Sequence, residues 1–211
     1  KEFYEERIAY VDSSVFKVFS YELIKGDPEK ALTEPNTIVL NETLAKKYFG
    51  DDEPVGKILL VGENRPFTVK GVMKDIPSNS HFKFNGFYSM KTLESIRGAE
   101  DFNSIEPIRF WSFSNYTFLL LKENASSSAI MEKFPTYYEK YMKTLGDQLG
   151  VTYKLVIQNL ADIHLKSELQ WDAPTGNIKY IYILSAIAFF ILSIAGINYM
   201  NMATARSTKR A

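Results

Sequence analysis

The side chains best suited to metal or acid–base chemistry are few and scattered. The sequence has two histidines, His81 and His164, which lie far apart along the chain. Two histidines with distant carboxylates could bind zinc, but neither belongs to an H-x-x-x-H or comparable local pattern. The chain has no cysteine, which excludes thiol nucleophiles, thiolate metal sites and disulfides. We expect both histidines to be structural or surface residues.

One acidic run, Asp51-Asp52-Glu53, offers three adjacent carboxylates. A calcium site needs oxygen ligands that alternate along a shaped loop, and this run lacks that spacing. We therefore interpret it as a solvated loop, with a cation site as the alternative. The sequence has no G-x-S-x-G, P-loop or G-x-G-x-x-G motif. We expect no catalytic residue, no cofactor and no metal.

An apolar stretch near the C-terminus dominates the organisation of the chain. Tyr180 to Ala205 contains no charged residue, and its apolar part, Ile181 to Met202, is about 22 residues long, enough to cross a bilayer as a helix. The alternative is a buried core helix of a soluble protein, but such helices are seldom apolar on every side for this length. We predict a transmembrane helix.

Basic residues follow the apolar stretch and predict its orientation. Arg206, Lys209 and Arg210 come directly after it, and Lys and Arg beside a span mark its cytoplasmic end. The chain before Tyr180 is therefore expected on the outer face of the membrane. Tyr180 and Tyr182 fall where an interfacial aromatic belt is expected.

Small and bulky side chains separate on the predicted helix. At about 100° per residue, the bulky Ile187, Phe190 and Ile194 lie on one half of the helix. The small residues that lie on the other half are Ser185, Ala186, Ala188, Ser193, Ala195, Gly196 and Ala203. Small residues let membrane helices approach closely, so we expect this half to pack against other helices. The alternative is a lone anchor.

The region before the span has the composition of an ordinary mixed domain. Lys and Arg number 25 and Asp and Glu number 25, so no basic excess would attract nucleic acid. The patterns predict strands over residues 7–11, 21–24, 37–40, 57–61, 67–73, 115–122 and 151–158. They predict helices over residues 15–19, 41–49, 92–96 and 126–148, the last interrupted at Pro135, and an extended segment over residues 162–165.

Several stretches together resemble one family. They are VDSSVFKVFSYELIKGDPEKAL, NTIVLNETLAKKYFGDDEPVGK, FTVKGVMKDIPSNSHFKF, DIHLKSEL and NIKYIYILSAIAFFILSIAGINYMNMATARSTKRA. In this order they resemble the MacB-like periplasmic core domain and the membrane helix that follows it in FtsX-like ABC transporter permeases. The resemblance is densest at both ends of the chain and weakest between residues 91 and 148.

The resemblance implies an α+β fold with two extracytoplasmic lobes and a transmembrane helix. Residues 1–86 and 151–175 would form a porter-like lobe, and residues 87–150 an inserted second lobe. Residues 177–205 would form the stalk and membrane helix, and residues 206–211 the start of a cytoplasmic segment. It also implies one membrane helix before Lys1 and two after Ala211.

The resemblance further implies a permease subunit in a bacterial inner membrane, mostly on the periplasmic side. Its partners would be a cytoplasmic ABC ATPase, a second permease copy, membrane lipid, and a periplasmic adaptor or cargo protein. ATP-driven motion would pass to the outer domain, and the chain itself would not be an enzyme. The alternatives are a ligand-sensing ectodomain of a membrane receptor and an anchored extracytoplasmic enzyme.

Overall fold

The computed structural model describes residues 4–112, 115–167 and 176–208. The chain divides into two compact units, Lys1–Ile157 and Gln158–Ala211. A six-stranded sheet organises the first unit. Its strands are β1 (Ile8–Val11), β2 (Leu23–Gly26), β3 (Thr37–Asn41), β4 (Ile58–Val61), β5 (Arg65–Met73) and β6 (Gly86–Ser89).

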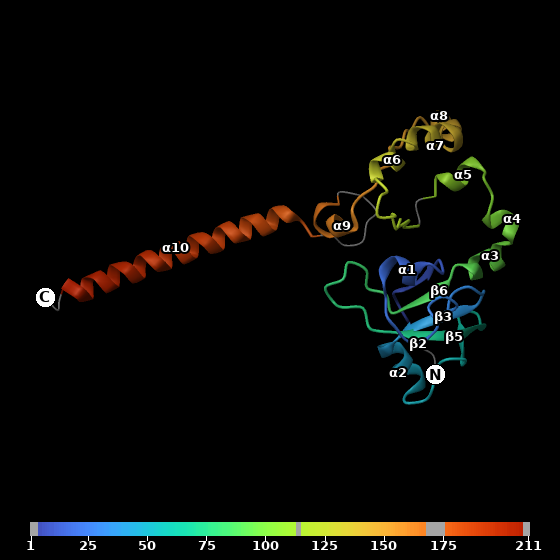
Figure 1. The fold of residues 1–211 in the computed structure, drawn as a ribbon, viewed down its shortest axis with the longest axis horizontal. Coiled ribbons are helices and arrows are strands. Elements are labelled where there is room, and N and C mark those ends of the chain that lie inside the picture. The colour runs from blue at the N-terminus through green and yellow to red at the C-terminus, as the bar shows by residue number, and fades with distance from the viewer. Residues whose placement is uncertain (1–3, 113–114, 168–175, 209–211) are drawn as a thin grey trace. The chain divides into compact units, whose positions relative to one another are not determined.

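The sheet is mixed, in the order β1-β6-β3-β5-β2 (Figure 1). β1 runs parallel to β6, and β3 runs parallel to β5, whereas β6 and β3 are antiparallel. β4 and β2 both pair antiparallel with β5, β4 with its first half and β2 with its second half. These two short strands therefore share one edge of the sheet.

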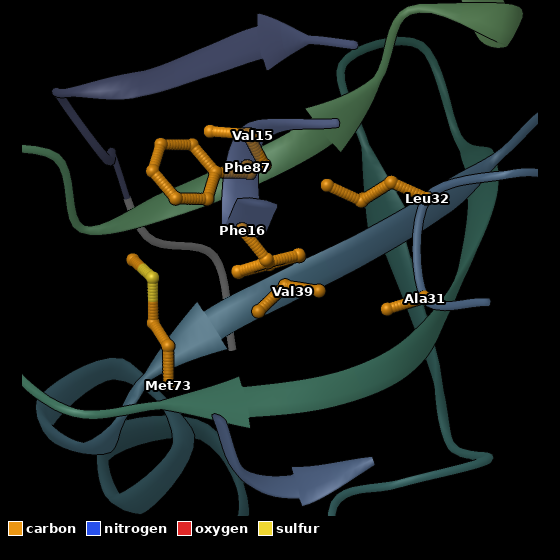
Figure 2. Close-up of a cluster of buried hydrophobic side chains, with 7 residues drawn as sticks. All are labelled: Val15, Phe16, Ala31, Leu32, Val39, Met73 and Phe87. Carbon is orange, nitrogen blue, oxygen red and sulfur yellow. The ribbon is translucent and has the colours of Figure 1, made fainter. Parts of the chain in front are cut away.

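Each face of the sheet is covered by one helix. Helix α1 (Val15–Phe19) packs Val15 and Phe16 against Val39, as Figure 2 shows. Helix α2 (Glu42–Phe49) packs on the other face, where its side chains join a cluster with Ile38 and Leu40. Successive strand residues point to opposite faces, so β3 supplies both layers of the core and is buried along its whole length.

Local signals explain where α2 begins and ends. The Asn41 side chain accepts a hydrogen bond from the Leu44 N–H at 2.9 Å, which satisfies one unpaired donor of the first turn. Gly50 follows the last residue and donates its N–H to the Lys46 carbonyl. Glu42 lies in the first turn and Lys46 and Lys47 in the last, as the helix dipole favours.

The rest of the first unit is built from short helices. They are α3 (Lys91–Arg97), α4 (Ala99–Phe102), α5 (Pro107–Phe110), α6 (Ser127–Met131), α7 (Phe134–Tyr141) and α8 (Lys143–Leu149). Pro135 lies in the first turn of α7, where its missing N–H does no harm. The predicted interruption of the helical region at this proline is confirmed.

These helices have a small core of their own. The Trp111 indole N–H donates to the Met142 carbonyl at 3.1 Å, and the Trp111 ring meets Tyr153 edge-on at 4.9 Å. Met142 is 1% exposed. A side chain at Gly146 would press on the Tyr138 hydroxyl and on the Val151 carbonyl. Close backbone approach therefore requires glycine at residue 146.

Two strands predicted from sequence are not formed. Residues 115–122 and 151–158 have no regular pairing, and most of their side chains are exposed. Phe118 nonetheless contacts Phe19 and Phe82, with ring centroids 4.9 and 5.2 Å away. These two contacts hold residues 115–122 against the part of the unit that contains the sheet. The prediction was wrong because apolar, β-branched content gives a strand only where a strand edge is available for pairing.

The second unit contains α9 (Leu160–Lys166) and α10 (Ile178–Thr208). The extended segment predicted over residues 162–165 is wrong, since α9 covers it. The Asn159 side chain accepts from the Ala161 N–H at 3.1 Å and begins this helix. Asp162 pairs with Lys166 one turn later at 2.8 Å, which adds local support.

Candidate functional site

The functional element with the strongest physical signature is α10. Residues Ile178–Arg206 of this helix are long and apolar enough to cross a membrane, and no residue in its most apolar window is buried. At 1.5 Å per residue, about 20 of its residues suffice for a hydrocarbon core of about 30 Å. It is the one such helix among the residues that the structure describes.

The N-terminal end and two hydroxyls of α10 have hydrogen-bond partners within the same segment. The Asn177 side chain accepts from the Lys179 N–H at 2.9 Å, as an N-cap does. Within the helix, the Ser193 hydroxyl donates to the Phe189 carbonyl and the Thr204 hydroxyl to the Met200 carbonyl, both at 2.8 Å. These bonds matter because the bilayer core offers no water as a partner.

The predicted packing face lies along α10. Its members Ser185, Ala188, Gly196 and Ala203 are exposed, and Ser193 is partly exposed. A Cβ at Gly196 would meet no atom within 4 Å. This half of the helix therefore has room for a neighbouring backbone, and its role as a helix-packing surface stays a prediction.

The basic flank is described only in part. Arg206 lies in the last turn of α10, where a cation is favourable. Lys209 and Arg210 lie outside the described residues, as do residues 168–175 of the predicted porter-like lobe.

A hydrogen bond connects α10 to α9. Gly176 donates its N–H to the His164 carbonyl at 2.7 Å, directly before the Asn177 cap. A side chain at residue 176 would have little space, since a Cβ there would lie 3.1 Å from Leu165 Cδ2. No local sequence pattern predicts this link, but the Asn159 cap and the Asp162–Lys166 spacing are sequence signals for α9.

The two histidines lie in different surroundings. His81 packs edge-on against Phe82 at a ring-centroid distance of 4.7 Å, whereas His164 is exposed on α9. Within residues 4–112, 115–167 and 176–208, no three His, Asp or Glu side chains are grouped as metal ligands would be.

The acidic run Asp51-Asp52-Glu53 is engaged by lysines. Asp52 pairs with Lys57 at 2.7 Å and Glu53 with Lys25 at 2.7 Å. The hydrogen bonds from these lysines lower the pKa of both carboxyl groups. Two of the three carboxylates therefore fasten the loop to the sheet edge rather than face a common centre.

A second charged cluster ties the N-terminal segment to α2. Partial burial of Glu5 opposes its ionisation, but hydrogen bonds from Lys47 and Tyr48 outweigh it and lower the pKa of the Glu5 carboxyl. Burial, together with the bond to Glu5, raises the pKa of the Tyr48 hydroxyl. The chain that enters β1 is thus held to the helix beneath the sheet.

A hollow of about 330 Å³ opens beside α3. Its lining includes Asp12, Lys91 and Glu94. Lys91 pairs with Glu94 at 2.6 Å, and hydrogen bonds from Ser14 lower the pKa of Asp12. Because its charges already have partners, the hollow offers little unbalanced charge to a ligand.

The fold and the apolar helix together define a class of protein. A mixed sheet with a helix on each face, followed by a helix of spanning length, is a membrane-anchored α+β outer domain. The family of MacB-like periplasmic core domains matches residues 2–137. The chain belongs to this family, and the expected fold class is confirmed. The protein is therefore membrane-anchored with a periplasmic domain.

Three solved structures show partial likeness to this chain. A permease-protein domain from Porphyromonas gingivalis is 22% identical with a TM-score of 0.45, covering 63% of this chain and 58% of that one. The periplasmic region of MacB from Actinobacillus actinomycetemcomitans is 16% identical with a TM-score of 0.39, covering 67% and 64%. The extracellular domain of the noncanonic ABC-type transporter YknZ from Gram-positive bacteria is 17% identical with a TM-score of 0.38, covering 74% of each chain.

The chain spans less than two thirds of the first two of these structures. A comparison with curated proteins found no match.

Proposed function

We propose that this chain is the outer domain and the following membrane helix of a permease subunit in an ABC transporter. The observation that carries the proposal is a MacB-like periplasmic core domain and a helix of spanning length in one chain. ATP hydrolysis by a cytoplasmic ABC ATPase moves the outer domain, which exports or extracts a substrate. A second permease copy completes the membrane part in the bacterial inner membrane, and a periplasmic adaptor or cargo protein meets the outer domain.

The shape of α10 supports a mechanical role. It continues unbroken from Ile178 to Thr208, a run of 31 residues that is visible as one rod in Figure 1. An α-helix of this length is about 46 Å long, and proline, the commonest cause of a sharp kink, does not occur in it. Movement at the cytoplasmic end is therefore carried to the outer end.

The bond between Gly176 and His164 supplies the next link. It joins the residue before the α10 cap to the last turns of α9. A displacement of α10 therefore acts on α9 rather than being absorbed in a loose connection. The chain continues from α9 directly to the first unit at Ile157.

The test uses the full-length protein in its membrane with its ATPase. If the protein is a permease subunit, an ATPase should co-purify with the tagged protein. ATP should also change the signal of a fluorophore placed on the outer domain. Gly176→Pro removes the N–H that His164 accepts, and it should suppress this change while ATP hydrolysis persists. Gly176→Ala keeps the N–H and is the matched control, since its Cβ would meet only the end of the flexible Leu165 side chain closely, at 3.1 Å.

The competing function is a ligand-sensing ectodomain. It shares the outer domain, the span and the basic flank, so the anchor alone does not separate the two. If no ATPase co-purifies and the outer domain responds to a periplasmic ligand but not to ATP, the permease proposal is refuted. If Gly176→Pro and Gly176→Ala behave alike, the helix-to-helix link is not the mechanical path.

A further inference from the structure

The N-terminal end of α10 and the last turn of α9 meet within the second unit of the chain. The Gly176 N–H donates to the His164 carbonyl and so joins the two helices. The hydrogen bond that Lys166 donates to Asp162 raises the pKa of the Lys166 ammonium, and the Tyr182 hydroxyl is near enough to add to this effect. Lys166 of α9 therefore lies close to the side of α10 that presents Tyr182.

Among the described residues, positive charges around Tyr182 exceed negative ones. Lys179 precedes Tyr182 by three residues, so the two side chains are neighbours on the surface of α10. Lys179 is exposed, and no carboxylate within residues 4–112, 115–167 and 176–208 pairs with its ammonium. Lys166 is paired with Asp162 at 2.8 Å, so the charge of Lys179 is the one left unbalanced among these groups.

The helix itself gives no reason for a cation at this end. The first turn of α10 contains no acidic residue that could pair with Lys179, and the helix dipole favours anions there. Helix α2 shows the favourable arrangement, with Glu42 in its first turn and its lysines in the last. The charge of Lys179 is therefore available to an anion from outside the chain.

These groups lie at the depth of the phospholipid headgroups. About 20 residues of helix cross the hydrocarbon core, so with Arg206 at one surface the core ends near Ser185 at the other. Tyr182 lies about 5 Å beyond that limit and Lys179 about 9 Å. The headgroup layer is about 5–7 Å thick on each side, and a lysine side chain is long enough to reach into it.

We propose that Lys179, Tyr182 and Lys166 bind the phosphate of a phospholipid in the membrane leaflet at this end of α10. A phosphodiester carries one negative charge, which balances the one unpaired positive charge. The Tyr182 hydroxyl and the two ammonium groups donate to its oxygens. Lys166 can do so while it remains paired with Asp162, because an ammonium has three donors.

The apolar surface beside Lys179 suits the acyl chains of the same lipid. Ile183 and Phe190 follow Lys179 by four and eleven residues, so they lie below it on the bulky half of α10. They are 54% and 64% exposed. The lipid would hold α9 as well as α10 at the membrane surface, since Lys166 belongs to α9. The inference concerns the anchor and does not depend on the proposed function.

The test uses the full-length protein in lipid nanodiscs. The discs consist mainly of digalactosyl diacylglycerol, which has no phosphate to compete for the site. The probe is phosphatidylglycerol with a photoreactive acyl chain, and digalactosyl diacylglycerol with the same chain is the phosphate-free control. Irradiation should label residues 183–190 about tenfold more with the phosphatidylglycerol probe, as measured by peptide mass spectrometry.

Two variants of Lys179 separate its charge from its packing. Lys179→Gln should lower the labelling by phosphatidylglycerol about tenfold, because a charge-assisted hydrogen bond is lost. Lys179→Arg keeps the positive charge and should retain the labelling. Equal helix content of the two variants in circular dichroism shows that the difference does not come from misfolding.

The two tyrosines of this end form a matched pair. Tyr180 and Tyr182 are 67% and 69% exposed, but they lie about 200° apart around the helix. Tyr182→Phe removes the hydroxyl from the proposed site and should lower the labelling about threefold. Tyr180→Phe removes a hydroxyl from the opposite side and should leave the labelling unchanged.

Release of Lys166 gives a readout in the opposite direction. Asp162→Asn removes the carboxylate that Lys166 pairs with, so the free ammonium should raise the labelling about threefold. Addition of Lys166→Gln should abolish this gain. A gain that persists without Lys166 would show that Lys166 is not part of the site.

Three results would overturn the proposal. Equal labelling by the two probes would mean that only the acyl chains are bound. Labelling of Lys179→Gln and Tyr182→Phe at the level of the parent would exclude these groups as the phosphate site. Loss of the label in excess inorganic phosphate would mean that the site takes free phosphate and not a lipid. Retention of the ATPase on the tagged protein is measured separately and bears only on the proposed function.

Discussion

Replacing Gly196 with leucine tests whether the small face of α10 packs against other membrane helices. A Cβ at this residue meets nothing within 4 Å in the structure, so the substitution does not strain α10 itself. Leucine also favours helix over glycine by about 1 kcal/mol. An isolated anchor helix would therefore be unchanged or slightly stabilised by Gly196→Leu.

A packed helix responds in the opposite direction. Overpacking a close contact costs about 1–3 kcal/mol, and every 1.4 kcal/mol is a factor of ten in an equilibrium constant. Gly196→Leu should thus weaken permease assembly about 5- to 150-fold, or uncouple ATP hydrolysis from movement of the outer domain. The control is Ile194→Leu on the bulky half, where lipid accepts either side chain equally.

The assay is performed on the full complex in membranes or detergent. It measures the ATPase retained on the tagged permease and the ATP-dependent signal of a label on the outer domain. If Gly196→Leu and Ile194→Leu both assemble and respond like the parent, α10 is only an anchor. The mechanical path proposed through its small face is then refuted.

Three further outcomes are expected. Ser78→Cys should react with an impermeant thiol reagent from outside the cell and Ser207→Cys should not, because Lys and Arg mark the cytoplasmic end of a span. Gly146→Ala should lower the stability of the α5–α8 region by about 1–3 kcal/mol in hydrogen exchange, since its Cβ would press on the Val151 carbonyl. Burial raises the pKa of Tyr88 to about 12, above about 10 in an unfolded chain. The stability that Tyr88 contributes is therefore complete below pH of about 10 and is lost as pH rises toward 12, which absorbance at 295 nm with circular dichroism will follow.

Each of these outcomes has a clear contradiction. Labelling of Ser207→Cys from outside would reverse the orientation and remove the permease reading with it. Unchanged exchange in Gly146→Ala would mean that α8 and residue 151 are not in close contact. A Tyr88→Phe protein that loses stability between about pH 10 and 12 as the parent does would show that ionisation of Tyr88 is not the cause of that loss.

The sequence alone was sufficient for elements whose signals are local. The span follows from an uncharged run and its flanks, because in lipid a single apolar segment must bond within itself. Helix α2 follows from the Asn41 cap and the Gly50 stop, which act within a few residues of the helix. The absence of cysteine and of known catalytic motifs likewise needed no structure.

Sequence patterns failed where the outcome depends on a partner. Residues 115–122 and 151–158 have strand-like composition, but a strand exists only when another edge accepts its hydrogen bonds. The composition of residues 162–165 predicts an extended segment, although the cap at Asn159 and one ion pair support a helix there. In each case the conformation of a short segment depends on its neighbours.

The tertiary structure decided the order of the sheet and the identity of its open edge. β1 pairs with β6 through Ile8 and Gly86, a contact between residues too distant in sequence for any local pattern to encode. β5 pairs with β3, β2 and β4, and among the described residues β4 has no second strand partner. Residues 58–61 are all apolar, so the sequence does not show which of their side chains face the core. Leu59 and Val61 face it because of the register of β4 against β5.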